Sequence, residues 1–222
     1  MGDAGAISRQ ALQRMPFYLQ QLKQLRQQGA DIATATMVAN ALRLNEVQVR
    51  KDFAAVSTRK GKPKTGFPID DLIENMEQIL GYRNVKDAIL VGAGSLGTAL
   101  LSYNSFRDYG VNIAAAFDVN PNVTGREIAG KMVFPMERLE ELCGRMQVHI
   151  GIITCPAAAA QEVCDRLVQA GILAVWNFAP THLNVPENIL VQNENMAASL
   201  AVLSRHLNDR LEECGAAEKK AR

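Results

Sequence analysis

The spacing of apolar residues changes near residue 82, and this change divides the chain into two parts. Before it, apolar residues recur every three or four positions, which is the period of amphipathic helices. After it, short apolar runs alternate with helical stretches, as in an α/β fold with a mostly parallel, doubly wound sheet. We therefore expect a helical domain at 1–81, an α/β domain at 82–193, one further helix at 194–214 and a disordered tail at 215–222.

The first part is predicted to hold four helices, at 10–28, from Thr34, from Asn45 and at 67–81. Thr34 and Asn45 are placed to N-cap the second and third helices, and Gln48 completes a capping-box pattern with Asn45. Two short helices joined by a tight turn predict a helix-turn-helix. The inward residues expected on the first, second and fourth helices are Leu12, Met15, Leu19, Leu22, Leu25, Val38, Ala41, Leu42, Leu72, Met76, Ile79 and Leu80.

In the second part, strands are expected at 87–91, 115–118, 131–134, 148–154, 173–177 and 188–192, and helices at 95–108, 136–146 and 157–170. The run at 148–154 is expected to be buried on both faces of the sheet. The last helix follows the last predicted strand, so no further element of the chain is expected to cover its apolar face. We therefore expect that face to pack against a partner surface. That face comprises Met196, Ala197, Leu200, Leu203, Leu207 and Leu211.

A glycine motif follows the first of these strands. Gly92, Gly94 and Gly97 form G-x-G-x-x-G between a strand and a helix, and Asp118 ends the next strand, 21 residues after Gly97. The motif alone could be a glycine-rich turn, but the preceding strand, the following helix and the acid together are typical of a Rossmann βαβ unit. In that unit the helix N-terminus binds a pyrophosphate and the acid binds a ribose. The carboxylate would repel a 2′-phosphate, so the motif predicts NAD(H) rather than NADP(H).

Composition narrows the class of protein. The 222 residues are 48% hydrophobic, with a net charge of +1, so there is no overall attraction to nucleic acid or to a membrane. The start of the chain does not read as a signal peptide, and no apolar run is long enough to span a bilayer. The four cysteines and three histidines follow no metal-binding spacing. We expect a cytoplasmic protein with reduced thiols and no metal.

Charge is concentrated locally. Between Arg43 and Lys64 there are seven basic and two acidic residues, a net charge of +5 in 22 residues. The segment 59–66 resembles a basic loop between two short extended pieces, as in a β-wing that follows a recognition helix. The alternative is a solvated, charged loop. Its place directly after a helix-turn-helix favours DNA binding.

Specific segments carry a family resemblance over about residues 6–207. They are 14–18 (RMPFY), 47–52 (VQVRKD), 91–97 (VGAGSLG), 115–119 (AAFDV), 155–161 (CPAAAAQ), 177–180 (NFAP) and 185–187 (VPE). On these residues the chain resembles the Rex family of redox-sensing transcriptional repressors. The resemblance implies a homodimer with an N-terminal winged helix, a C-terminal Rossmann domain and a last helix swapped onto the partner. It further implies a non-enzymatic protein that binds an inverted-repeat operator with NAD⁺ or no ligand and is released by NADH.

The candidate residues fall into three groups. Those expected at the cofactor are Gly92, Gly94, Ser95, Leu96, Gly97, Tyr103, Asp118, Val119, Thr154, Cys155, Pro156, Asn177, Phe178, Ala179 and Pro180. Those expected at DNA are Arg14, Gln48, Arg50, Lys51, Arg59, Lys60, Lys62 and Lys64. Those expected at the switch are Gln20, Asn195 and Met196. The resemblance places Tyr103, 155–156 and 178–180 at the nicotinamide end. We interpret Cys155 as a small packed residue rather than a redox thiol.

The chain departs from the family pattern at several positions. The wing segment reads GKPKTGF, and Arg43 stands where glycine is usual. Gln20 and Asn195 stand where the family often has an arginine and an aspartate, which can form a charged network with the tyrosine at position 103. An amide–amide bond is worth about 1 kcal/mol, against about 1.5–3 for a charge-assisted one. We expect the coupling of cofactor to DNA to differ accordingly.

Two other functions are alternatives to this interpretation. An NAD-dependent oxidoreductase needs an acid or base near the nicotinamide, and His182 is the one tempting candidate. No carboxylate lies close to it in sequence, and the chain has no substrate domain of useful size. The other alternative is a nucleotide-binding scaffold of the CoA-binding type with no role at DNA. Such a scaffold needs no basic segment, so the basic residues at 50–64 argue against it.

Overall fold

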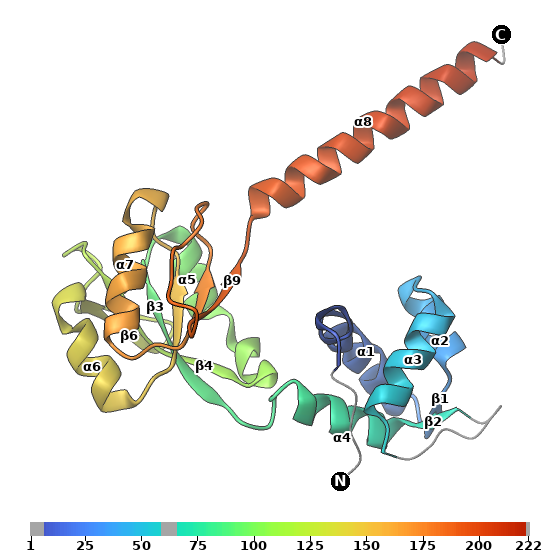
Figure 1. Cartoon of the computed structure of the whole chain (residues 1–222), viewed down its shortest axis with the longest axis horizontal. Helices are drawn as coiled ribbons and strands as arrows, with labels where there is room; N and C mark the ends of the chain where they lie inside the picture. Colours follow the sequence, from blue (N-terminus) through green and yellow to red (C-terminus); the bar gives the residue numbers. More distant parts are fainter. Residues whose placement is uncertain (1–6, 59–65, 221–222) are drawn as a thin grey trace. The chain divides into compact units, whose positions relative to one another are not determined.

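The computed structural model describes residues 7–58 and 66–220, with side chains described as far as Glu212. Contacts within the chain divide it into two units (Figure 1). The N-terminal unit ends at Val85 and also includes Arg107–Gly110, and the C-terminal unit comprises the remainder. Each unit has its own apolar core. The boundary at Val85 lies close to the change in apolar spacing.

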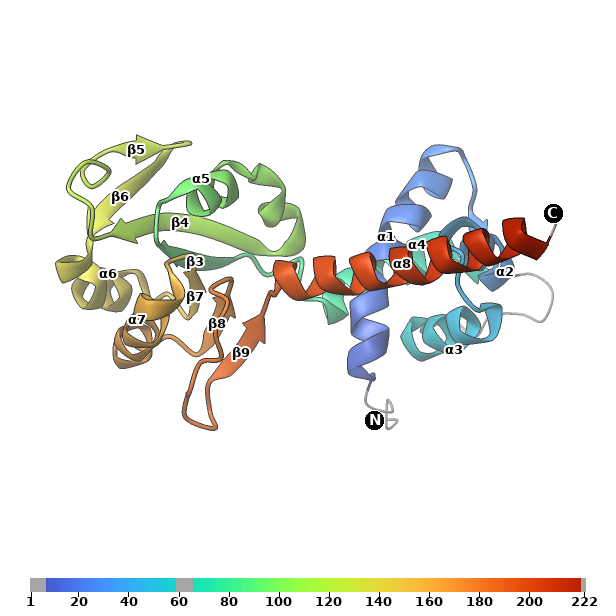
Figure 2. The same ribbon diagram turned by 90° about the horizontal axis from the view of Figure 1, so that it is seen from above.

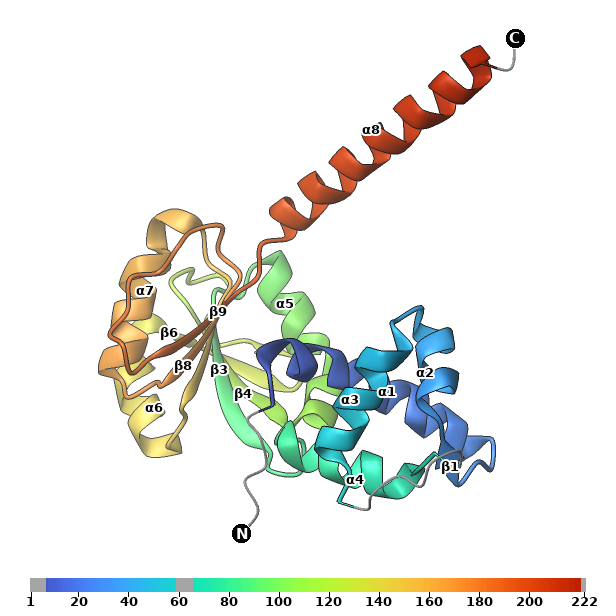
Figure 3. The same ribbon diagram turned by 45° about the vertical axis from the view of Figure 1, so that its right-hand side comes forward.

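The N-terminal unit consists of helices and a small antiparallel sheet (Figure 3). Its elements are α1 (Arg9–Gln27), β1 (Ile32–Ala33), α2 (Ala35–Leu42), α3 (Glu46–Val56), β2 (Phe67–Pro68) and α4 (Ile69–Ile79). Ala33 of β1 pairs with Phe67 of β2. The helices meet in a core of fully buried side chains that includes Met15, Tyr18, Leu22, Val38, Val49, Phe53, Leu72 and Met76. The sequence prediction of four helices is confirmed.

The predicted caps of the second and third helices are confirmed. Thr34 Oγ1 accepts a hydrogen bond from the Met37 amide at 3.1 Å, and Asn45 Oδ1 accepts one from the Gln48 amide at 3.2 Å. The reciprocal half of the capping box is wrong, because the Gln48 side chain donates to Asp52 instead.

Two residues predicted to face inward are exposed instead. The buried face of α2 follows Ala35, Val38 and Ala39, so Ala41 lies off it and is exposed. The buried face of α4 follows Ile69, Leu72, Ile73 and Met76, which leaves Ile79 38% exposed. Val38, Leu72 and Met76 are buried as predicted, and Ala41 and Ile79, which follow Val38 and Met76 by three residues, lie beyond the edge of the buried face.

Arg43 lies in the left-handed region at the C-cap of α2, with φ 53° and ψ 45°. A residue with a Cβ pays about 1–2 kcal/mol to adopt this conformation, whereas glycine adopts it freely. This backbone conformation explains the preference for glycine at this turn.

The C-terminal unit is a seven-stranded sheet in the order β5-β6-β4-β3-β7-β8-β9, parallel except for the β5–β6 pair. The strands are β3 (Lys86–Val91), β4 (Val111–Asp118), β5 (Glu127–Ile128), β6 (Lys131–Pro135), β7 (Ile150–Ile153), β8 (Ala174–Asn177) and β9 (Leu190–Asn193). The helices are α5 (Ser95–Ser102), η2 (Met136–Arg138), α6 (Leu139–Met146), α7 (Ala157–Gln169) and α8 (Met196–Lys220). The 3₁₀ helix η1 (Asn104–Tyr109) begins in this unit and ends in the N-terminal unit, which includes Arg107–Gly110. The doubly wound α/β prediction is confirmed.

Helices cover both faces of this sheet, α5 on one and α6 and α7 on the other (Figure 2). Ile152 and Ile153 of β7 belong to different core clusters, one on each face. The prediction that this strand is buried on both faces is therefore confirmed.

Several element boundaries differ from the predictions. The strand expected at 115–118 begins earlier, at Val111, and the helix expected at 67–81 spans only Ile69–Ile79. The helix expected at 95–108 ends at Ser102, because Tyr103 is extended with ψ 92°, and a 3₁₀ helix follows. The helix expected at 136–146 begins as the 3₁₀ turn η2. The prediction of a disordered tail from residue 215 is wrong as far as Lys220, because α8 continues to that residue. Ala216, Ala217 and the residues to Lys220 are strong helix formers, and one glycine costs only about 1 kcal/mol.

The described part of α8 is exposed along its apolar stripe. Leu200, Leu203, Leu207 and Leu211 are 66, 64, 56 and 60% exposed. No helix among the described residues carries an apolar stretch long enough to cross a membrane. Nor do the described residues include a group of His, Cys, Asp or Glu side chains that could hold a metal ion.

Candidate dinucleotide site and nucleic-acid interface

The loop between β3 and α5 contains the three motif glycines, and each has a different physical reason to be glycine. Gly92 has φ +103°, and a Cβ there would lie 2.9 Å from the Cys155 amide nitrogen. A Cβ on Gly97 would overlap the carbonyl oxygen of Gly92. A Cβ on Gly94 would meet no atom within 4 Å. Gly92 therefore shapes the loop and Gly97 permits the helix to pack, whereas Gly94 leaves its backbone open to a ligand.

The N-terminus of α5 faces this open position. Gly94 is the N-cap and has no side chain that could accept hydrogen bonds from the first turn. The amides of Ser95 and Leu96 therefore belong to the groups that a helix leaves without internal partners, and these groups attract anions.

Asp118 is held beside the glycine loop. Its Oδ2 accepts a hydrogen bond from the Ala93 amide at 2.6 Å, and its Oδ1 accepts one from the Asn120 amide at 2.8 Å. β4 is the neighbour of β3 in the sheet, which brings the ends of both strands to one edge. The carboxylate is half-buried and retains lone pairs for further donors, whereas Val119 is 82% exposed. The structure thus places the predicted acid next to the predicted phosphate loop.

A second loop, after β7, contacts the first. The Thr154 hydroxyl donates to the Gly92 carbonyl at 2.7 Å, and the Thr154 amide donates to the Val91 carbonyl at 2.9 Å. Pro156 occupies the N-cap of α7 and, like Gly94, offers no side-chain cap. Thr154 therefore ties the two loops together along the carboxyl edge of the sheet.

The Cys155 thiol is half-buried in this second loop. Burial raises its pKa, as does the charge of Asp118. A thiol whose pKa is raised is less ionised and less reactive at neutral pH. This favours the interpretation of Cys155 as a packed residue.

Asn177 is buried and uses its amide within the chain. Its nitrogen donates to Thr181 O at 2.9 Å and to Asn193 Oδ1 at 2.8 Å, and its oxygen accepts from the Ala179 amide at 3.0 Å. Asn177 therefore shapes the turn that contains Phe178, Ala179 and Pro180. Ala179 is buried and Pro180 is exposed, so these residues differ in their access to a ligand.

Aromatic rings connect two of the three segments expected at the nicotinamide end. Tyr103, 50% exposed, contacts Phe106 at 4.8 Å between ring centroids, and Phe106 contacts Trp176 at 5.6 Å. Trp176 in turn contacts Phe178 at 4.7 Å, and its Nε1 donates to Glu194 Oε1 at 3.0 Å, just before α8. Sequence reasoning missed Phe106, Trp176 and Glu194. The available signal for Trp176 is its place in the strand predicted at 173–177, directly before Asn177 and Phe178.

The third helix, α3, presents one polar and two basic side chains to solvent. Gln48, Arg50 and Lys51 are exposed, and Arg50 is ion-paired with Glu46 one turn earlier. Such a surface pair is worth at most about 1 kcal/mol, so the guanidinium can exchange to a phosphate. Arg59, Lys60, Lys62 and Lys64 lie outside the described residues.

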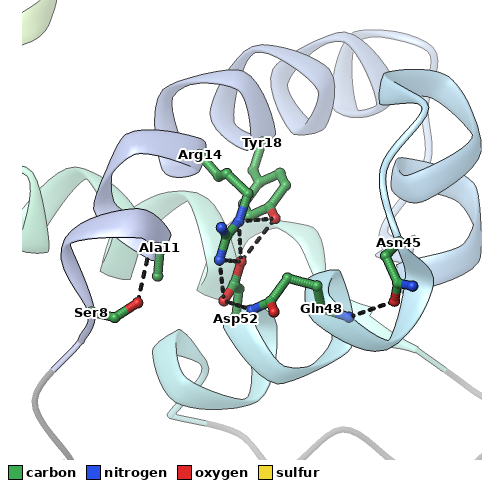
Figure 4. Close-up of polar contacts among 7 residues, drawn as sticks. All are labelled: Ser8, Ala11, Arg14, Tyr18, Asn45, Gln48 and Asp52. Carbon is green, nitrogen blue, oxygen red and sulfur yellow. Dashed lines mark hydrogen bonds and ion pairs between the residues drawn. The ribbon is translucent and has the colours of Figure 1, made fainter.

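Arg14 is placed differently from the other basic candidates. Its guanidinium is ion-paired with Asp52 of α3 at 2.8 Å, and its side chain is only 24% exposed (Figure 4). The structure thus directs Arg14 to another side chain of the same unit.

The three switch candidates lie on different elements. Gln20 of α1 lines a cavity of about 550 Å³ within the N-terminal unit. Asn195 Oδ1 accepts from the Ala198 amide at 2.9 Å, so it N-caps α8, and Met196 is 61% exposed. A pairing of Gln20 with Asn195 stays a prediction.

Comparison with known families matches both parts of the chain. Residues 83–181 match the family described as CoA binding domain, and residues 6–54 match the family described as putative DNA-binding protein N-terminus. The second match argues against a nucleotide-binding scaffold without a DNA-binding part.

Relatives align over most of the chain. The redox-sensing transcriptional repressor Rex of Porphyromonas gingivalis is 40% identical over 192 residues, covering 86% of this chain and 88% of the relative. The Rex repressor of Bacteroides fragilis is 37% identical, covering 93% of each. The crystal structure of RSP, a Rex-family repressor, with β-NAD⁺ and operator DNA has a TM-score of 0.86 at 31% identity, covering 95% of this chain and 97% of that one. The complex of RSP with β-NADH has a TM-score of 0.83 at 30% identity, covering 95% and 99%.

Proposed function

The chain belongs to the Rex family of redox-sensing transcriptional repressors, and we propose that it binds operator DNA as a homodimer and leaves it when NADH occupies the glycine-rich loop. The observation that carries this proposal is the presence, in one chain, of an open glycine loop with Asp118 beside it and a helix-turn-helix with an exposed basic α3. Its relative RSP has been crystallised both with NAD⁺ and operator DNA and with NADH.

For the cofactor, we propose that the pyrophosphate lies over Gly94 on the amides of Ser95 and Leu96. The Asp118 carboxylate would accept the ribose hydroxyl hydrogen bonds. The nicotinamide end would lie toward Tyr103, the 155–156 turn and Phe178. The open space at Gly94 and the uncapped first turn of α5 fit a bound dinucleotide phosphate.

For DNA, we propose that α3 is the recognition helix and that Arg50 and Lys51 contact the operator, with the basic residues of 59–64 as wing contacts. A dimer with two such helices suits an inverted repeat, whose half-sites lie about 34–36 Å apart. We assign the dimer contact to the exposed leucine stripe of α8. The protein would act in the cytoplasm, where DNA and the NAD(H) pool meet.

We propose no catalytic role for the cofactor site. His182, the residue considered as a base, is exposed, and no hydrogen bond from its imidazole to a carboxylate is found in the part of the chain that the structure describes. The close relatives are repressors by name.

The test uses operator sequences selected from a randomised inverted-repeat library by the full-length protein. Binding to a selected site is followed by fluorescence anisotropy with no nucleotide, with NAD⁺ and with NADH. NADH alone should release the DNA. Quenching of the fluorescence of Trp176, the single tryptophan, shows that NADH is bound. DNA that stays bound at saturating NADH would contradict the proposal.

A further inference from the structure

Asp52 is a buried carboxylate on the helix proposed to read DNA. It is 4% exposed, although it follows directly after Arg50 and Lys51, which are exposed on the same helix. Burying a charge is costly unless the charge is paired and hydrogen-bonded. Its position therefore requires strong partners.

Those partners come from two helices (Figure 4). From α1, Arg14 Nε donates to Asp52 Oδ2 at 2.9 Å and Arg14 Nη2 donates to Oδ1 at 3.1 Å, while the Tyr18 hydroxyl donates to Oδ2 at 2.8 Å. From α3 itself, Gln48 Nε2 donates to Oδ1 at 2.9 Å. The fork of Arg14 engages both carboxylate oxygens, which fixes orientation as well as distance.

Tyr18 adds a second constraint. Its fully buried ring packs edge-on against Phe53 of α3, with centroids 5.6 Å apart, and Phe53 packs in the same way against Phe67. Burial raises the pKa of Tyr18 to about 12, so its hydroxyl stays protonated and donates to Asp52. One side chain thus contacts α3 through both a directional bond and an apolar surface.

The apolar contacts of α3 alone define its orientation weakly. The helix has 11 residues, and its buried apolar side chains are Val49, Phe53 and Val56. Apolar packing is non-directional, whereas a charge-assisted, bidentate hydrogen bond has a preferred geometry. A small rotation of α3 about its axis would preserve much of the packing but break the bonds to Asp52.

We propose that Asp52, held by Arg14 and Tyr18, is a positioning residue that sets the rotation of α3 and so aims Arg50 and Lys51 at the operator. The inference rests on the proposed function. It reassigns Arg14, which the sequence suggested as a DNA contact, to the support of the recognition helix. Gln48 shares this support in the free protein, because its side-chain amide is bonded to Asp52.

The test measures operator affinity and its salt dependence for full-length Asp52→Asn, Arg14→Gln and the double variant. Arg26→Gln is the matched control, since Arg26 is also on α1 but its ion pair with Asp70 is exposed. Folding is checked by circular dichroism and by NADH affinity. Each single variant should bind the operator about tenfold more weakly, with an unchanged salt slope and unchanged NADH affinity. The control should change affinity less than about twofold.

The double variant should bind no more weakly than the weaker single variant, because both changes break one interaction. Arg14→Lys, which keeps the charge but loses the fork, should resemble Arg14→Gln. The proposal is overturned if Arg14→Gln lowers the salt slope by about 1 while Asp52→Asn leaves affinity intact, since Arg14 is then a phosphate contact. It is also overturned if the folded variants lose thermal stability but keep the wild-type operator affinity.

Tyr18→Phe serves if the other variants do not fold, because it removes one donor and keeps the ring contact with Phe53. It should weaken operator binding about threefold without changing NADH affinity. A folded Tyr18→Phe protein with wild-type operator affinity would overturn the proposal. In that outcome the carboxylate serves the stability of the unit and not the aim of α3.

Discussion

The carbonyl oxygen of Gly92 lies where a side chain on Gly97 would begin, so the glycine turn and the first turn of α5 pack without room for a methyl group. At Gly94, by contrast, a Cβ would meet no atom within 4 Å. These two glycines, three residues apart, therefore serve different ends. One permits the helix to pack, and the other permits a ligand to approach.

This contrast predicts opposite phenotypes for two equivalent substitutions. Gly97→Ala should destabilise the C-terminal unit by about 1–3 kcal/mol, because it overpacks the loop. Gly94→Ala should leave the melting temperature nearly unchanged but weaken NADH binding at least about tenfold, since the methyl group occupies the pyrophosphate position. Calorimetric unfolding and NADH titration measure both effects. Tight NADH binding by Gly94→Ala would remove this loop from the cofactor site.

Asp118 should set the preference for NADH over NADPH. Asp118→Ala is expected to narrow the gap between the two affinities, because it removes both the ribose acceptor and the charge that repels a 2′-phosphate. Asp118→Asn keeps an oxygen that can accept from the Ala93 amide, so it separates charge from hydrogen bonding. Isothermal titration with both cofactors is the measurement. Equal affinity of the wild-type protein for NADH and NADPH would contradict the assignment of Asp118 to the ribose.

Local features of the chain were predictable, and long-range contacts were not. Thr34, Asn45 and the glycine motif act within a few residues of themselves, so their roles can be inferred from spacing. The bond between Arg14 and Asp52 joins residues 38 positions apart, and nothing in the spacing of either indicates it. Asn177 was expected at the cofactor, but its amide partners belong to the turn and to β9.

Helix ends were misjudged where propensity and periodicity disagreed. Apolar residues continue at helical spacing past Ser102, yet the chain becomes extended at Tyr103 and turns into η1. After Glu213 the periodic stripe stops, yet α8 continues to Lys220, because its residues favour helix without needing a buried face.

The leucine stripe of α8 predicts an obligate dimer. Truncation after Asn193 removes the stripe and should expose its partner surface, giving aggregated or unstable protein. Light scattering coupled to size-exclusion chromatography measures the outcome. A well-behaved monomer with normal NADH affinity would contradict the assignment of the dimer contact to α8.

The switch prediction concerns Gln20 and Asn195. Replacing them together, as Gln20→Arg with Asn195→Asp, should restore a charge-assisted bond between protomers and raise the NADH concentration needed for DNA release. Aspartate also N-caps helices well, so the cap that Asn195 gives to Ala198 should survive. Release is followed by anisotropy, with each single variant as a control. If the double variant releases DNA at the wild-type NADH concentration, this pair does not set the switch.

The most direct test of the central claim is a titration of the NADH/NAD⁺ ratio at a constant total nucleotide concentration, with the bound fraction of a selected operator as the readout. NADH can release DNA only through a higher affinity for the released form. The account predicts that the bound fraction falls as the ratio rises and is the same at two total concentrations that both saturate the site. A bound fraction that follows the total concentration and ignores the ratio would contradict it.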